Sequence, residues 1–356
     1  MKRFLVTLAA LMLIGTGFAA SAQENETPEY GYKQTGFMST PKVGGYIIGS
    51  YKYSDLEGSH GGDGFNCRLI RLYVDGSIFN DFKYRIQLQM NGNPHVKDFY
   101  VEWAKYKEFS VKVGQFKRAF TFENPMNPWD VGVGDFSLLV QKFAGMGDRL
   151  GEANMGGRDQ GLQVQGDLFP IGQTQHRLIH YQLGIWNGQG INRVDENGAK
   201  DIIGTLQFQP IQGLYVGAFG WFGNWVNAAG ETLNRERISA GVKYDRDNWT
   251  FRAEYATAIG GEKDQTGASD ALYVTAGIPV KDWLKIYAKW DQFRDKHLAA
   301  AGKDISSTSH NMYSACANFR LHKNLNFQLE YRRHNNKLLG DNAKYNEIWA
   351  MAYIRF

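Results

Sequence analysis

The chain has 356 residues and a formal net charge of +4, and Lys2 and Arg3 contribute two of those charges. Such a balance does not predict a protein that binds nucleic acid or other polyanions in general. The two cysteines, Cys67 and Cys316, are too few for a disulfide framework, although a single bridge between them stays open. The 41 Gly and 50 aromatic residues (22 Phe, 19 Tyr, 9 Trp) suit β structure with tight turns and interfacial rings.

The N-terminus has the pattern of a cleaved secretory signal. A basic start is followed by an apolar run over 4–14 and by the small residues Ala20, Ser21 and Ala22. An uncleaved anchor would need about 18 unbroken apolar residues, and Gly15 interrupts the run. We therefore expect residues 1–22 to be a signal peptide, 23–42 a short periplasmic segment, and the exported chain to begin at Gln23.

Alternating segments of about 8–12 residues then recur to the end of the chain. In "FKYRIQLQM", residues 82–90, Tyr84, Ile86 and Leu88 alternate with cationic and amide side chains. Successive side chains of a strand point to opposite faces, so each segment reads as a strand with one apolar face. We count about 16, with no convincing helical period: 43–53, 65–78, 82–90, 97–103, 109–117, 159–168, 177–186, 203–209, 214–222, 237–244, 249–257, 271–278, 284–291, 311–321, 325–334 and 347–356.

The connections alternate between short turns and long loops. Short turns on one rim and long loops on the other are typical of outer-membrane barrels, whereas a soluble sandwich has no reason to alternate in this way. An even number of strands also closes without an edge. The sequence therefore predicts an all-β fold, a transmembrane antiparallel β-barrel over 43–356, with short periplasmic turns, long external loops and its apolar face toward the outer-membrane lipid.

The last strand ends on Phe356, with apolar residues at every second position before it. This ending resembles the signal that the barrel assembly machinery recognises, although an ordinary apolar terminal strand would look the same.

Residues 65–123 carry a more specific resemblance. The stretches "CRLIRLYVDGSIFNDFKYRIQLQM" and "KDFYVEWAKYKEFSVKVGQFKRAFTFEN" resemble the phosphate-selective porin O and P family of Gram-negative outer-membrane porins. This resemblance implies a 16-stranded barrel, a homotrimer, pore-folded loops and a cationic lumen.

The polar face of the strands supplies the expected pore lining, because a pore selects by size and by the field of its charges. We predict anion contacts from eleven residues: Arg71, Lys83, Arg85, Lys112, Arg118, Arg149, Lys243, Arg252, Lys285, Lys289 and Arg332. The same charges could equally form a salt-bridged, hydrated lining. The sequence shows no catalytic or metal-binding motif, so we expect no enzyme activity, cofactor or metal.

The segment 118–157 is much longer than the other connections, and long loops without regular structure tend to be functional or disordered. We expect it to constrict the pore, with an outward loop or a trimer contact as the alternatives. The expected function is passive diffusion of small hydrophilic solutes, with a preference for anions such as phosphate. A closed barrel acting as an adhesin or structural protein, and a substrate-gated channel, are the competing hypotheses.

Overall fold

The computed structural model describes residues 34–35, 37–56, 63–145, 156–226, 230–261, 269–296, 302 and 308–356. Residues 34–356 form one compact unit, and residues 1–33 are assigned to another. The predicted signal peptide and most of the predicted periplasmic segment lie outside the described residues.

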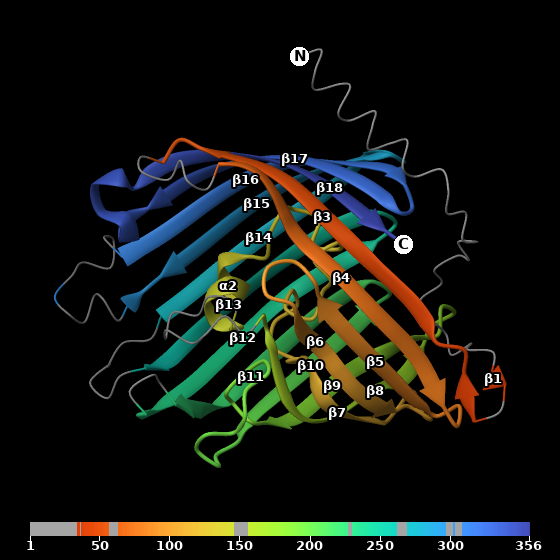
Figure 1. Cartoon of the computed structure of the whole chain (residues 1–356). Coiled ribbons are helices and arrows are strands. Elements are labelled where there is room, and N and C mark those ends of the chain that lie inside the picture. Colours follow the sequence, from red (N-terminus) through yellow and green to blue (C-terminus); the bar gives the residue numbers. More distant parts are fainter. Residues whose placement is uncertain are drawn as a thin grey trace. The chain divides into compact units, whose positions relative to one another are not determined.

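The described part of the chain is almost entirely β-structure (Figure 1). Two short strands come first, β1 (Gln34–Thr35) and β2 (Met38–Ser39). Sixteen longer strands follow: β3 (Lys42–Ser54), β4 (Gly64–Ile78), β5 (Phe82–Gln89), β6 (His95–Trp103), β7 (Ser110–Lys117), β8 (Arg158–Ile171), β9 (His176–Trp186), β10 (Asp201–Ile211), β11 (Leu214–Val226), β12 (Thr232–Arg246), β13 (Trp249–Gly261), β14 (Ser269–Lys281), β15 (Leu284–Arg294), β16 (Ser309–His322), β17 (Leu325–Asn336) and β18 (Lys344–Arg355).

The strands β3 to β18 form a closed antiparallel barrel. Each pairs with the next, and β18 returns to pair with β3. At this seam the backbone of Phe356 exchanges two hydrogen bonds with Gly45, at 2.9 and 3.0 Å. A side chain on residue 45 would collide with the Phe356 ring. The absence of a side chain at Gly45 therefore leaves room for this terminal ring. The predicted 16-stranded barrel is confirmed.

The alternation along each strand is inside out compared with a soluble protein. In β17 the apolar side chains Leu329 and Tyr331 are each 47% exposed, whereas Gln328, Glu330 and Arg332 are buried. The polar face therefore points into the barrel and the apolar face points outward, over the whole ring of strands. A soluble sandwich would bury the opposite face, so an apolar solvent such as lipid must cover the outside.

Short turns join the strands at one rim. The β4–β5 turn places Phe79 and Asn80 at φ of 51° and 63°, and the β12–β13 turn places Asp247 and Asn248 at 51° and 64°. Two successive residues with positive φ match the twist of a tight hairpin. Asn and Asp adopt this conformation more readily than most residues, and both turns contain one.

Helix is scarce in the described residues. The segment after β7 contains one helical turn and a half, α2 (Leu138–Phe143), and a 3-10 segment, η4 (Lys337–Asn342), precedes β18. The sequence did not predict α2, because six residues are too few to show a helical period. No helix in the described part of the chain is long and apolar enough to cross a membrane.

A charged side chain on the outward, apolar face of the barrel should destabilise the protein. Replacing Leu206, which is 58% exposed at the middle of β10, with arginine should lower the free energy of unfolding from lipid vesicles by about 2–4 kcal/mol. The neighbouring Gln207→Arg variant points into the lumen and should lose much less. Guanidinium titrations followed by tryptophan fluorescence would measure both, and equal losses would contradict the assignment of the two faces.

Candidate functional site

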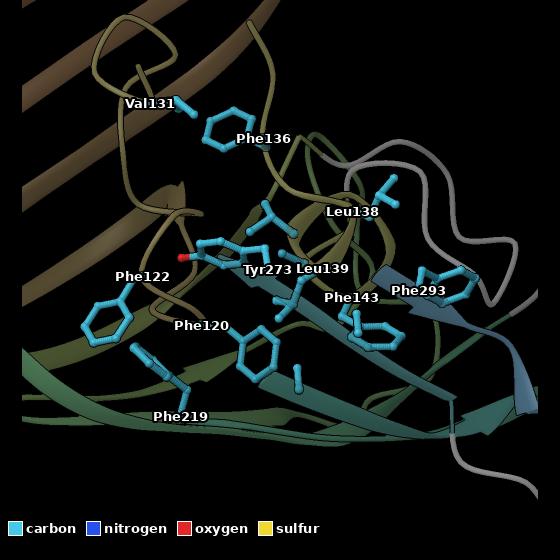
Figure 2. Packing of buried hydrophobic residues seen from close by; sticks show 14 of the residues in the cluster. Phe120, Phe122, Val131, Phe136, Leu138, Leu139, Phe143, Phe219, Tyr273 and Phe293 are labelled. Carbon is cyan, nitrogen blue, oxygen red and sulfur yellow. The ribbon is translucent and has the colours of Figure 1, made fainter. Parts of the chain in front are cut away.

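The main apolar core lies inside the barrel and is formed around the segment that follows β7, residues 118–145 in its described part. Phe120, Phe122, Leu139 and Phe143 from this segment are at most 4% exposed. They pack against wall side chains that include Phe219, Tyr273 and Phe293 (Figure 2). The segment therefore folds inward, and α2 lies against β13, β14 and β15.

Three carboxylates of the barrel wall accept hydrogen bonds from the backbone of this inward loop. Phe122 donates its N–H to Glu254 at 3.1 Å, and Leu138 donates to Asp291 at 3.1 Å. Gly134 donates to Glu330 at 2.7 Å. The carboxylates come from β13, β15 and β17, so three alternate strands each bind one part of the loop. An unpaired buried N–H is costly, and these contacts remove that cost.

Cationic side chains and one amide of the barrel wall donate hydrogen bonds to the backbone carbonyls of the loop. Arg252 donates to the carbonyl of Val131 at 3.0 Å, and Gln328 donates to that of Gly132 at 3.0 Å. Lys289 lies 3.4 Å from the carbonyl of Asp135. Arg68 and Arg237 donate to the carbonyls of Gly134 and Phe143.

The short helix α2 is fixed by its own cap and by a buried carboxylate. The Ser137 hydroxyl accepts a hydrogen bond from the N–H of Val140, as an N-cap residue does. The Ser137 N–H in turn donates to Glu123 at 2.8 Å. Because Lys289 lies 3.9 Å from Glu123 and 3.6 Å from Asp291, one wall lysine serves two carboxylates at the start of the helix.

The eleven predicted anion contacts fall into two groups, with Arg149 outside the described residues. One group is buried against the wall or the inward loop: Arg71, Arg118, Arg252, Lys289 and Arg332. Arg71 donates to Gln87 at 3.1 Å, and Arg332 is paired with Glu330 at 2.8 Å. The structure gives these residues partners inside the protein.

The second group is partly open to the lumen: Lys83, Arg85, Lys112, Lys243 and Lys285. Arg85 forms a bidentate pair with Asp75, both contacts at 2.7 Å, and lies over the Tyr73 ring. Lys112 is 3.2 Å from Glu102 and lies over the Tyr100 ring. The wall from β4 to β7 thus presents cations with acidic and aromatic neighbours.

Three predicted residues come together around one carboxylate, Asp245. Arg252 lies 3.1 Å from it, and Lys285 reaches it through Thr250, with 2.8 Å for each of the two hydrogen bonds. Lys243 on β12 pairs in register with Arg252 on β13, and it interacts electrostatically with the same carboxylate. Gly277 makes this arrangement possible, because a side chain there would collide with Lys285 and Tyr287.

The structure also places the predicted residue Arg118 beside Arg235 and Arg237, which were not among the eleven predicted contacts. Arg118, Arg235 and Arg237 all lie over the Trp221 ring, with guanidinium carbons 4.2–4.7 Å from its centre. Asp201 accepts from Arg235 at 2.6 Å and from the Trp221 N–H at 2.7 Å. The alternation of β12 could have indicated the inward side of Arg235, but its partners lie on other strands.

Arg68 and Arg158 were not among the predicted contacts either. Arg68 pairs with Asp135 of the inward loop at 2.8 Å. Arg158 begins β8 and holds Asp98 of β6 through two contacts, at 2.8 and 2.9 Å. The sequence reasoning placed Arg158 within the long loop, and the adjacent strand pattern gave no reason to extend β8 over it.

No group of three or more metal-ligating side chains occurs among the described residues. His310 and His334 share a hydrogen bond of 3.0 Å, and His180 pairs with Asp167 at 2.8 Å. Both cysteines are free, Cys67 being exposed and Cys316 buried. This excludes the bridge that the sequence left open.

The barrel resembles several solved outer-membrane proteins, each at a low sequence identity that shows the fold alone. An anion-selective porin from Comamonas acidovorans aligns with a TM-score of 0.67 and 14% identity, over 89% of this chain and 99% of that one. The channel DcaP of Acinetobacter baumannii gives 0.61 and 14%, over 92% and 99%. A trimer form of OmpT from Vibrio cholerae gives 0.60 and 13%, over 89% and 99%. No curated protein sequence matches the chain.

The sequence profile of the Gram-negative porin family matches residues 7–339. Together with the closed barrel and its polar interior, this match indicates a channel. The chain belongs to the Gram-negative porins, and it forms an outer-membrane channel for small solutes.

Proposed function

We propose that this porin lets small hydrophilic solutes diffuse passively and that it prefers anions, phosphate among them. The observation that carries the preference is the group of Lys243, Arg252 and Lys285 around the single carboxylate of Asp245. Charges of one sign in a narrow, partly dry channel raise the local concentration of the opposite ion. The lysines are half-buried, so part of each side chain is open to the lumen.

We further propose that the inward loop constricts the pore. Its apolar side chains and its backbone are both held by the wall from β10 to β18, so it occupies part of the lumen. Solutes would then pass through the rest of the lumen, which is lined by the partly open cations Lys83, Arg85, Lys112, Lys243 and Lys285. The predicted range, 118–157, includes residues outside the described part, and the contacts above concern 118–145 alone.

Three further expectations belong to the same proposal. We propose a homotrimer, and the trimer form of the similar OmpT supports it. We propose that residues 1–22 direct export and are removed, in agreement with an outer-membrane location. We propose that Phe356 is read by the barrel assembly machinery, since the terminal ring lies at the seam that closes the barrel.

Releasing the loop should widen the pore. The double variant Glu254→Ala and Asp291→Ala removes the acceptors of two buried loop N–H groups, each worth about 1–3 kcal/mol. We expect a larger and noisier single-channel conductance in planar bilayers. Glu236→Ala changes an exposed carboxylate of β12 and serves as the control. An unchanged conductance in a double variant that still folds would contradict the proposed constriction.

The charge around Asp245 should set the ion preference. Lys285→Glu should lower the chloride-to-potassium permeability ratio about thirtyfold, since it changes the charge by two units and each unit at about 4 Å in water is worth roughly 1 kcal/mol. Reversal potentials under a KCl gradient, before and after phosphate is added, measure the ratio and any block. Lys281→Glu, an exposed residue at the end of β14, is the control.

An unselective wild-type channel would remove the anion preference and leave a general porin. A folded barrel without conductance would favour the closed adhesin or structural alternative.

A further inference from the structure

A second part of the lumen wall adjoins the cations near Asp245. On β8, β9 and β10 the inward side chains include acidic and apolar residues together with five amides: Gln163, Gln165, Gln182, Gln207 and Gln209. Gln165 accepts hydrogen bonds from Gln163 at 2.6 Å and from Gln182 at 3.3 Å. Its own amide donates to Glu102 at 2.7 Å, so the row is oriented by a carboxylate at one end. Gln165, Gln182 and Gln207 are half-buried and reach the lumen.

Of these amides, Gln207 lies near a tyrosine and a lysine on the next two strands. Gln207 on β10 pairs in register with Gly217 on β11, two residues above Tyr215. Tyr215 pairs in register with Lys243 on β12, whose ammonium lies 4.5 Å from the centre of its ring. Both side chains are half-buried. Within the described residues, Lys243 has no ion pair within 4.0 Å.

The inward loop closes one side of this region. Because Gly217 has no side chain, the Phe122 ring of the loop lies against the wall beside Gln207; a Cβ at 217 would come within 2.8 Å of that ring and 3.2 Å of Gln207. Lys243 also lies over Phe122, at 5.6 Å from the ring centre. Gln207, Tyr215 and Lys243 therefore share one stretch of wall next to the loop.

These groups match three features of one kind of solute. An amide both donates and accepts hydrogen bonds, so it suits hydroxyl groups, which do the same. A tyrosine ring offers an apolar surface to the C–H face of a sugar ring. A lysine whose ammonium forms no direct ion pair with the wall binds a carboxylate or a phosphate by a charge-assisted hydrogen bond.

We propose that Gln207, Tyr215 and Lys243 form a binding site for sugars that carry an anionic group, such as sugar acids and sugar phosphates. The Gln207 amide binds a hydroxyl group, Tyr215 contacts the sugar ring, and Lys243 binds the anion. The site rests on the proposed channel function and adds a solute class to it. The pair of His180 with Asp167 adjoins Gln207 and borders the site.

Single-channel recordings with added solute test this site, because a bound solute interrupts the chloride current. Glucuronate and glucose 6-phosphate should each block in a concentration-dependent manner, whereas glucose and acetate should block at least about tenfold more weakly, since losing one charge-assisted hydrogen bond costs about that factor. A difference between the two anionic sugars would show whether the site favours a carboxylate or a phosphate.

Two variants distinguish binding at this site from a general electrostatic effect of the pore on anions. Lys243→Gln should raise the half-blocking concentration of glucuronate about tenfold, and Tyr215→Leu should raise it while leaving the reversal potential in KCl unchanged. Lys281→Gln is the matched control on an exposed turn.

Two results would overturn the site: equal block by acetate and glucuronate, or unchanged block in both variants. In either case an anion-biased reversal potential would leave the proposed ion preference standing. Loss of that bias in the wild-type channel, with glucuronate still blocking, would instead remove the preference and keep the site.

Discussion

The structure depends on satisfying the backbone of a loop that enters a barrel. Residues 118–145 leave the sheet after β7, and their N–H and C=O groups cannot find partners in a neighbouring strand. Glu254, Asp291 and Glu330 accept from the loop, while wall cations and Gln328 donate to it. Because buried backbone groups must be paired, the wall carries these side chains at the points where the loop passes.

This requirement divides the charges of the lumen between two tasks. Arg252 and Lys289 hold loop carbonyls, and Arg332 neutralises a carboxylate that holds a loop N–H. Lys243 and Lys285 are half-buried and partly open to the lumen instead. A count of inward charges therefore overstates the field inside the lumen, since paired and buried groups contribute little to it.

The barrel itself was predictable because its signal is local and repeated. The sixteen alternating segments correspond to β3–β18, and the short turns fall between the expected strands. The short helix α2 was not predicted, because its six residues are too few to show a helical period. The start of β8 was also placed too late, since Arg158 precedes the clear alternation and is fixed by Asp98 on a different strand.

The sequence alone determined which side of each strand is polar, because alternation with period two follows from backbone geometry. It therefore determined the inward side of Arg252, Lys289 and Glu330. Only the tertiary structure decided which of the inward side chains contact the loop and which stay partly open to the lumen. That choice depends on contacts between residues more than a hundred positions apart, such as Phe122 with Glu254 and Gly134 with Glu330. No local pattern encodes such a contact, since it arises only when the barrel closes around the loop.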